Sequence, residues 1–259
     1  MQFDYVIVGG GSAGSVLAAR LTEDPGTTVC LIESGGAGRS FLIRTPAMVA
    51  TMVSGRPKIH NWAFRTEPQK HLNNRRCYQP RGRALGGSSA INAMLYVRGH
   101  PGDYDEWADL GADGWDWASV RPWFLRAESH EGGGSDHHGG AGPLQVRRQP
   151  SPQRASRAFV QAAGLVQIPE NDDFNGPSQL GAGLFDVTQF HSGPLRGQRC
   201  SAAAAYLHPV MARPNLTVLT GALAERIVLE DGRATGIILH HKRRRLTVTA
   251  RREVILSAG

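Results

Sequence analysis

The sequence predicts an α/β protein with a Rossmann-like parallel unit at its N-terminus and an antiparallel meander in its last third. At the start, an apolar strand, a glycine-rich turn, a helix and a second apolar strand follow one another. In the last third, short strand patterns alternate with turn signals. The 259 residues are enough for one or two domains with a substantial core.

The N-terminal segment predicts a βαβ unit. Residues 5–8 have the pattern of a buried strand, residues 9–11 are three glycines in a tight turn, and residues 13–21 have the pattern of a helix. Residues 27–33 are a second apolar strand that ends in an acid. Parallel pairing of the two strands requires a right-handed crossover.

The middle of the chain is irregular. Residues 35–80 are rich in loop residues, and residues 103–128 carry acids and tryptophans at irregular helical spacing. Residues 131–142, EGGGSDHHGGAG, predict a flexible surface loop. Residues 155–164 predict a helix.

The last third predicts a series of strands. Residues 215–221 form one strand, and residues 224–241 form two strands joined at Asp231-Gly232, a strong hairpin signal. Residues 245–259, RLTVTARREVILSAG, predict two further strands.

The charge pattern has two interpretations. The formal net charge is +7, and a large part of it lies in residues 242–245, with Arg251 and Arg252 close behind. Such a run is either a patch for nucleic acid or an anionic membrane, or the solvated tip of a hairpin. No aromatic residue interleaves with the basic ones, which argues against stacking on bases. We therefore expect a hairpin tip and no nucleic-acid partner.

Cysteine usage and hydropathy give expectations about location. The three cysteines lie far apart with no metal or disulfide spacing, which is typical of a reducing compartment, and Cys30 is expected to be a small buried hydrophobe. No apolar run is long enough to span a membrane, and no secretion signal is visible. The expected location is the cytoplasm, with peripheral association at the inner membrane left open.

The pairs His137-His138 and His240-His241 are interpreted as solvated loop histidines, and no metal site is expected.

The first glycine-rich segment, residues 9–14, fits the dinucleotide-binding pattern G-x-G-x-x-G between a strand and a helix. Gly9 allows the tight turn, Gly11 lets the backbone approach a pyrophosphate, and Gly14 permits close packing of helix on strand. The N–H groups and partial positive charge of the helix N-terminus face the phosphates. A merely structural turn is the alternative.

Glu33 follows Gly14 by 19 residues, at the end of the second strand. A carboxylate at that position accepts hydrogen bonds from ribose hydroxyls and repels a 2′-phosphate. The sequence therefore favours a dinucleotide without that phosphate. The first loop alone does not separate FAD from NAD.

A second glycine-rich segment, GRALGGSSAINAMLYVRG, occupies residues 82–99. Its glycines let backbone N–H groups come close to a ligand, and Ser88, Ser89 and Asn92 supply short polar side chains. An ordinary surface loop would have polar flanks, whereas residues 90–95 are largely apolar. A second donor-rich segment indicates a larger cofactor held at both ends, as FAD is.

This second segment resembles the first signature of the glucose–methanol–choline (GMC) oxidoreductase family of flavoenzymes. The matching positions are Gly82, Arg83, Leu85, Gly86, Gly87, Ser88, Ser89, Ile91, Asn92, Tyr96, Gly99 and Asp105. The resemblance covers the whole chain, and further family landmarks lie at residues 61–69, 142–146, 172–176, 199–209, 213–222 and 252–259. Within the family, the chain is most similar to bacterial choline dehydrogenase-like alcohol dehydrogenases.

The resemblance implies a set of FAD-binding residues. The ADP part of FAD would be held by Gly9, Gly11, Ser12, Ala13, Gly14 and Glu33, with Val218 offering its backbone to the adenine. The pyrophosphate and flavin would be lined by Gly82, Leu85, Gly87, Ser88, Asn92, Ala93, Met94 and Leu95. Trp62 would pack near the cofactor, and Ala258 would lie beside the dinucleotide. Some relatives carry covalent FAD on a histidine of this signature; Ile91 stands here instead, so non-covalent FAD is expected.

The resemblance also implies the domain organisation. It predicts a Rossmann-like FAD-binding domain with a β-meander, formed by residues 1–150 and 215–259, and the first part of an α+β substrate domain in residues 151–214. Family members continue beyond the position of Gly259, with the histidine that assists removal of the alcohol proton. We therefore expect no catalytic residue in this chain, no activity of the chain alone, and a missing C-terminal half or partner chain.

The expected reaction is the FAD-dependent oxidation of a small-molecule alcohol to an aldehyde by hydride transfer to flavin N5. The alternatives are an alcohol oxidase that uses dioxygen, a catalytically silent FAD-binding fragment, and a nucleic-acid binder that uses the basic hairpin tip. The sequence does not identify the alcohol or the electron acceptor.

Overall fold

The computed structural model describes all residues from 1 to 259 and divides into two compact units. Unit 1 comprises Met1–Ala93 and Ser201–Gly259, and unit 2 comprises Met94–Cys200. The division differs from the predicted domain boundaries at residues 150 and 214, because residues 94–150 pair with strands and loops of residues 151–200. The assignment of FAD-binding and substrate domains stays a prediction.

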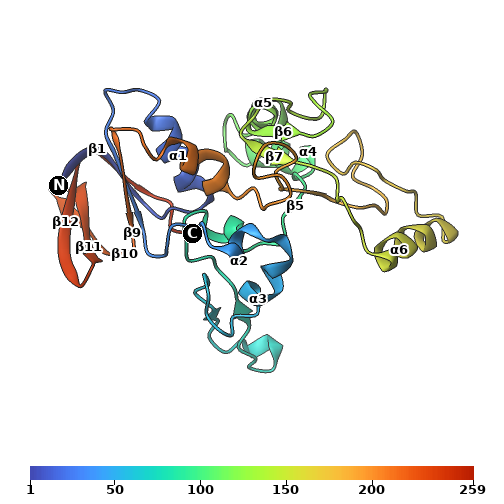
Figure 1. Cartoon of the computed structure of the whole chain (residues 1–259), viewed down its shortest axis with the longest axis horizontal. Helices are drawn as coiled ribbons and strands as arrows, with labels where there is room; N and C mark the ends of the chain where they lie inside the picture. The colour runs from blue at the N-terminus through green and yellow to red at the C-terminus, as the bar shows by residue number, and fades with distance from the viewer. The chain divides into compact units, whose positions relative to one another are not determined.

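Unit 1 is built around a six-stranded sheet (Figure 1). Its strands are β1 (Gln2–Val8), β2 (Val29–Glu33), β9 (Leu216–Thr220), β10 (Ala222–Glu230), β11 (Arg233–His241) and β12 (Arg244–Leu256), with a separate pair β3 (Phe64–Arg65) and β4 (Tyr78–Gln79). Its helices are α1 (Ser12–Leu21), α2 (Phe41–Arg44) and α3 (Val49–Val53), with a π-helical turn at Ala203–Leu207 and short 3₁₀ turns at Pro46–Met48, Lys70–Leu72, Gly87–Ala90 and His208–Val210.

The strand order of the large sheet is β10-β11-β12-β1-β2-β9. β1 is parallel to both β2 and β12, and β2 is parallel to β9. β10, β11 and β12 form an antiparallel meander whose first turn lies at Asp231-Gly232. The predicted α/β class, the βαβ unit and the hairpin are thus confirmed.

One predicted detail is wrong. Residues 245–259 were expected to form two strands, but β12 is a single strand of 13 residues. Its first half pairs with β11 and its second half, from Thr249 onward, pairs mainly with β1. A strand that changes partners along its length needs no turn, and this pairing is not visible in a local pattern.

The core follows the alternation of side chains along β1 and β2. Ile7 and Leu31 point to one face, where they pack against α1 and the helical turn Ala203–Leu207. Val6 and Cys30 point to the other face, where they pack against residues of the meander. Both faces of the parallel strands are therefore covered, which explains the unbroken apolar runs at residues 6–8 of β1 and 29–32 of β2.

Unit 2 has shorter elements. They are β5 (Leu95–Tyr96), α4 (Pro101–Asp109), α5 (Trp117–Ala127), β6 (Glu128–His130), β7 (Leu144–Val146), α6 (Arg154–Leu165) and β8 (Asp186–Val187). β5 pairs with β8, and β6 pairs with β7. The helix predicted at residues 155–164 is α6, and the pattern at residues 103–128 corresponds to α4 and α5.

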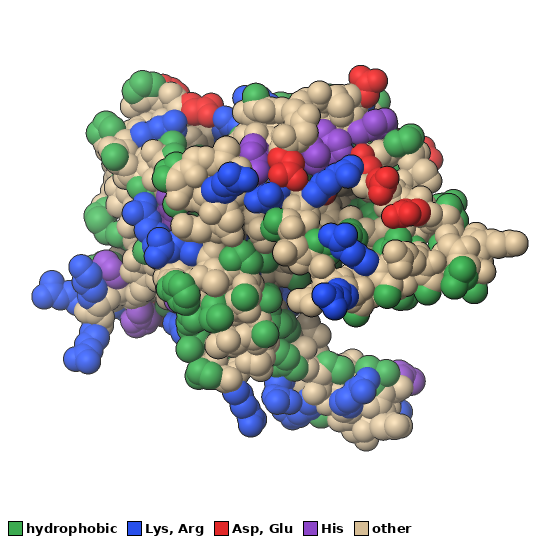
Figure 2. Space-filling model, turned by 45° about the vertical axis from the view of Figure 1, so that its right-hand side comes forward, with side chains coloured by type: hydrophobic (Ala, Val, Ile, Leu, Met, Phe, Trp, Pro, Cys, Tyr) green, Lys and Arg blue, Asp and Glu red, His purple; other side chains and the backbone are tan.

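The surface shows where the positive charge lies. Positively charged side chains are spread over the face shown in Figure 2 rather than gathered in one field. Lys242 and Arg243 form the turn between β11 and β12, and both are exposed, as predicted for a hairpin tip. None of the helices combines the length and the apolarity that crossing a membrane would require. The cytoplasmic location stays a prediction.

The three cysteines differ in burial, which makes thiol chemistry a test of the fold. Cys30 and Cys200 are buried, and burial raises the pKa of each thiol to about 12. Only thiolates react readily with DTNB. At pH 8 the native chain is expected to react rapidly at Cys77 alone, and at all three thiols after denaturation. Rapid labelling that persists in a Cys77→Ser variant would contradict the burial of Cys30 in β2 or of Cys200.

Candidate functional site

The first glycine-rich loop connects β1 to α1. Gly9 has a φ of 97°, in the region that favours glycine, and its N–H donates to the Ile32 carbonyl at 2.8 Å. A Cβ on Gly14 would lie 1.9 Å from the Gly9 carbonyl oxygen, so only glycine allows α1 to start this close to the strand. Gly11 caps α1 without a side-chain hydrogen bond, and the first turn contains no acid. The helix N-terminus therefore keeps its donors and positive potential for an anion.

Glu33 lies at the end of β2 and ties the first loop to it. Its carboxylate accepts hydrogen bonds from the N–H of Gly10 at 2.9 Å and from the N–H of Gly35 at 2.7 Å. The residue is only 6% exposed. A carboxylate has about four acceptor positions. Glu33 therefore holds the loop in place and retains acceptor capacity for hydroxyl groups.

The second glycine-rich loop lies directly against the first. The Gly86 N–H donates to the Gly10 carbonyl at 2.7 Å. A Cβ on Gly87 would lie 2.7 Å from the Cα of Gly11, so the two backbones are in van der Waals contact. Gly86 and Gly87 have φ values of 95° and 53°. Two segments more than 70 residues apart in sequence thus form one surface of backbone groups.

The start of the second loop folds back on its own glycines. A Cβ on Gly82 would lie 1.9 Å from the Gly87 carbonyl oxygen, and the Gly82 N–H donates to Ser88 Oγ at 3.1 Å. The Leu85 side chain is fully buried and lies against Gly10, whose Cβ would come within 2.6 Å of it. Leu85 is therefore part of the support beneath the loops.

The end of β12 forms a further wall. A Cβ on Gly9 would lie 2.5 Å from the Ser257 carbonyl oxygen and 2.7 Å from the Ala258 Cα. Ala258 therefore lies beside the first loop. Val218 is opposite Leu31 in β9, which is an edge strand of the sheet. On such a strand, alternate backbone groups face away from the sheet and are open to a ligand.

Trp62 lies beside the start of the second loop. The backbone N–H of Trp62 donates to the Arg81 carbonyl at 2.9 Å, and the Arg83 guanidinium lies 4.3 Å from the centre of the Trp62 ring. The ring also stacks on Phe64, with ring centres 5.5 Å apart. Trp62 therefore belongs to an aromatic and cationic group next to Gly82.

The structure brings together most of the predicted residues. The residues joined by the contacts above are Gly9, Gly11, Gly14, Glu33, Gly82, Leu85, Gly87, Ser88 and Ala258, with the exposed Ser12 and Ala13 following Gly11. Asn92 donates its backbone N–H to the Ser88 carbonyl at 2.9 Å, and Ala93 follows it at the end of the first segment of unit 1. Met94 and Leu95 belong to unit 2.

Several supporting contacts were not predicted. The Ser89 hydroxyl donates to the Gly86 carbonyl at 2.6 Å and accepts from the Ala202 N–H at 2.9 Å. A Cβ on Gly35 would lie 2.1 Å from the Arg83 carbonyl oxygen. The buried Asn61 side chain binds the backbone at Met52 and Arg81. These contacts join segments far apart in sequence, and no local pattern marks them.

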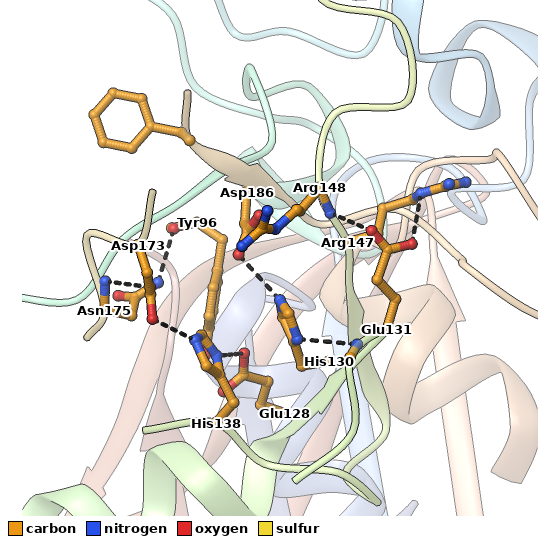
Figure 3. Close-up of polar contacts among 12 residues, drawn as sticks. Tyr96, Glu128, His130, Glu131, His138, Arg147, Arg148, Asp173, Asn175 and Asp186 are labelled. Atoms are coloured by element: carbon orange, nitrogen blue, oxygen red, sulfur yellow. Dashed lines mark hydrogen bonds and ion pairs between the residues drawn. The ribbon is translucent and has the colours of Figure 1, made fainter. Parts of the chain in front are cut away.

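The interpretation of His138 as a solvated loop histidine is wrong. Its side chain is 10% exposed and makes ion pairs with Glu128 at 2.8 Å and Asp173 at 2.9 Å (Figure 3). His240, by contrast, is 53% exposed and pairs with Glu225. No group of three or more His, Cys, Asp or Glu side chains has a metal-binding arrangement.

The donor set fits a dinucleotide. The α1 N-terminus supplies N–H donors and positive potential for phosphates, and Glu33 supplies acceptors for hydroxyls. The close backbone approach at Gly11 and Gly87 leaves no Cβ in the way of a ligand. The match with sequence models decides the family: the GMC oxidoreductase model covers residues 3–259.

The chain belongs to the GMC oxidoreductase family. It is 46% identical over 259 residues to an oxygen-dependent choline dehydrogenase of Sinorhizobium fredii, covering 100% of this chain and 46% of the relative. It is 45% identical over 262 residues to the protein of that name in Burkholderia pseudomallei, with 100% and 45% covered. The chain thus spans about half the length of the curated relatives it matches.

Solved structures similar to this chain have the same fold. Pyridoxine 4-oxidase from Mesorbium loti matches with a TM-score of 0.91 and 36% identity, over 99% of this chain and 49% of that chain. An FAD-dependent oxidoreductase from Chaetomium thermophilum matches with a TM-score of 0.88 and 30% identity, over 99% and 45%. The GMC family expected from residues 82–105 is therefore confirmed.

The contact between the two loops is tested by a methyl group. Gly87→Ala would place a Cβ at a φ of 53° and 2.7 Å from the Gly11 Cα. We expect a loss of about 1 kcal/mol or more in the free energy of unfolding, because both the backbone conformation and the contact are strained. The measurement is urea unfolding of the chain.

Gly36→Ala is the matched control. A Cβ on Gly36 meets no atom within 4 Å, and its φ lies outside the left-handed region. This variant is expected to match or slightly exceed the stability of the wild type. Equal stability of the Gly87 and Gly36 variants would contradict the close approach of the loops.

Proposed function

We propose that this chain binds FAD non-covalently where its two glycine-rich loops meet. The hydrogen bond from the Gly86 N–H to the Gly10 carbonyl is the observation that carries the proposal. One loop with a helix N-terminus suffices for one pyrophosphate, whereas two joined loops provide a longer surface for a cofactor with a second large part.

Each predicted residue has a proposed role in that complex. The N–H groups from Gly11 to Gly14 hold the pyrophosphate, and Glu33 accepts from the ribose of the adenosine part. Val218 offers its backbone to the adenine. Gly82, Gly87 and Ser88, with Leu85 beneath them, line the pyrophosphate and the flavin, followed by Asn92, Ala93, Met94 and Leu95. Trp62 and Ala258 pack beside the cofactor.

Ile91 supports the non-covalent mode. It occupies the position at which some relatives carry a histidine, and its aliphatic side chain is 3% exposed and has no nucleophile. FAD, when bound, supplies a two-electron acceptor for a hydride. Within this chain, the residues named above bind and orient; none is assigned to remove a proton.

We propose that the whole protein is an FAD-dependent alcohol dehydrogenase that converts a small alcohol to an aldehyde. The support is the 46% identity to relatives named choline dehydrogenases, of which this chain covers about half. The chain alone is expected to bind the cofactor without oxidising alcohols. Nothing in the described contacts singles out choline among small alcohols.

An oxidase that uses dioxygen is the second candidate. The pyridoxine 4-oxidase match, at 36% identity and a TM-score of 0.91, favours it. The two candidates differ in the electron acceptor, so rapid hydrogen peroxide formation by a reconstituted protein would favour the oxidase.

Ser12→Asp separates cofactor binding from folding. Ser12 is exposed at the first position of α1, where a carboxylate stabilises the helix by about 0.3–1 kcal/mol and repels a pyrophosphate. We expect an unchanged or higher unfolding midpoint together with an FAD affinity lower by about tenfold or more. The measurement is quenching of flavin fluorescence on titration with the chain, and Ser12→Ala is the control. Equal affinities of the Asp variant and the wild type would place the pyrophosphate elsewhere.

The mode of attachment has its own test. Acid precipitation of the FAD-loaded chain is expected to release all the flavin into the supernatant, because Ile91 cannot form a bond to the isoalloxazine ring. Flavin that remains with the pelleted protein, detected as a mass increase of the intact chain, would contradict the non-covalent mode.

A further inference from the structure

Unit 2 contains a closed ring of hydrogen bonds that the proposed function does not use. The Arg98 guanidinium pairs with Glu128, Glu128 accepts from His138 Nδ1 at 2.8 Å, and His138 Nε2 faces Asp173 at 2.9 Å. Asp173 accepts from the Asn175 N–H at 2.8 Å, and the Asn175 side-chain oxygen accepts from the Arg98 N–H at 2.8 Å. Figure 3 shows the part of this ring from Glu128 to Asn175.

Geometry determines the charge of His138. Both of its ring nitrogens face carboxylate oxygens, and ionised carboxylates only accept hydrogen bonds. Both nitrogens must therefore carry protons. The hydrogen bond to Glu128 raises the pKa of His138, burial opposes this, and the bond to Asp173 raises it further. His138 is thus a cation that joins two carboxylates.

The neighbouring His130 has the opposite state. Its Nδ1 accepts from the Gly132 N–H at 3.1 Å, so that nitrogen is unprotonated, and Nε2 donates to Asp186 at 3.1 Å. Its ring stacks on that of His138, with centres 4.2 Å apart. A neutral ring avoids the repulsion that a second cation would cause. Asp186 belongs to β8, where it pairs with Tyr96.

Hydrogen bonds therefore connect both histidines to β5. Asn175, held by the ring, donates its side-chain amide to the Tyr96 carbonyl at 3.2 Å, and Arg98 is itself a member of the ring. On the other side, β8 pairs with β5, and the Thr188 N–H donates to the Met94 carbonyl at 2.8 Å. Met94 has a φ of 65°, a conformation that its surroundings must maintain.

We propose that Glu128, His138 and Asp173 are positioning residues for the flavin-lining residues Met94 and Leu95, through a ring that closes only when His138 is protonated. The proposal rests on the proposed function, because it assigns these two residues to the flavin. Met94 and Leu95 immediately precede the segment that the ring holds. The ring would lower the entropy that this segment loses when it binds the flavin.

The pH dependence follows from the groups around His138. Glu128 and Asp173 face its nitrogens, the neutral His130 covers one ring face, and Arg98 reaches it through Glu128. Deprotonation removes one donor, so one carboxylate oxygen of Glu128 or Asp173 loses its hydrogen bond and the ring opens. Order in β5 is therefore fully present below the ordinary histidine pKa near 6.5 and is lost as pH rises through the raised pKa.

Hydrogen exchange in the full chain without cofactor tests the ring directly. After correction for intrinsic rates, the amides of residues 95–98 are expected to lose protection in the wild type as pH rises above neutrality. His138→Gln should lower this protection about tenfold near pH 6.5 and make it independent of pH. His137→Gln is the matched control, because His137 contacts Arg98 through its backbone carbonyl, which the substitution keeps.

A second variant shifts the pH at which exchange protection is lost, without opening the ring. Asp173→Asn keeps an acceptor for His138 Nε2 but removes a negative charge, so the loss of protection should occur at a lower pH than in the wild type. This variant decides the question if His138→Gln does not fold. Unchanged pH profiles of exchange protection in every variant that folds would contradict the proposed role of the ring.

FAD affinity, measured by fluorescence quenching, completes the test. His138→Gln is expected to bind FAD about tenfold more weakly than the wild type and His137→Gln, because the flavin-lining segment starts less ordered. Altered exchange with unchanged affinity would overturn the positioning role. If the wild type does not bind FAD, the proposed function fails and the positioning role with it, while the exchange profile still reports on the ring.

Discussion

The close approach of two backbones, at Gly11 and Gly87, is the constraint on which the rest of this site depends. A single methyl group on Gly87 would separate them, because its Cβ would lie 2.7 Å from the Gly11 Cα. A hydrogen bond of 2.7 Å from the Gly86 N–H to the Gly10 carbonyl fixes how the two loops align. Because no side chain intervenes, the two backbones form one surface, on which the N–H groups at the start of α1 remain open to an anion.

The sheet places these loops through elementary strand geometry. β2 and β12 each pair with β1 in parallel, so the carboxyl ends of the three strands lie at one edge of the sheet. Glu33 ends β2 and binds the Gly10 N–H, while Ser257 follows β12 and packs against Gly9. Ligands of open α/β sheets bind at this edge. The site is therefore a consequence of the topology, and the helix α1 adds the positive potential.

Local patterns were sufficient where the decisive contacts are local. The turn at Gly9, the packing of Gly14 and the hairpin at Asp231-Gly232 depend on neighbouring residues, and the sequence predicts each of them. The single strand β12 and the buried His138 depend on distant partners. The nearest carboxylates of His138 come from residues 128 and 173, and a run of glycines and histidines gives no sign of either.

The central claim is that both loops contact one cofactor, and hydrogen exchange on adding FAD tests it most directly. The amides of residues 10–14 and of residues 82–88 should both gain protection in the same titration, with the same dissociation constant. Protection confined to residues 10–14 would mean that the second loop only supports the first. No gain in either loop would contradict the site itself.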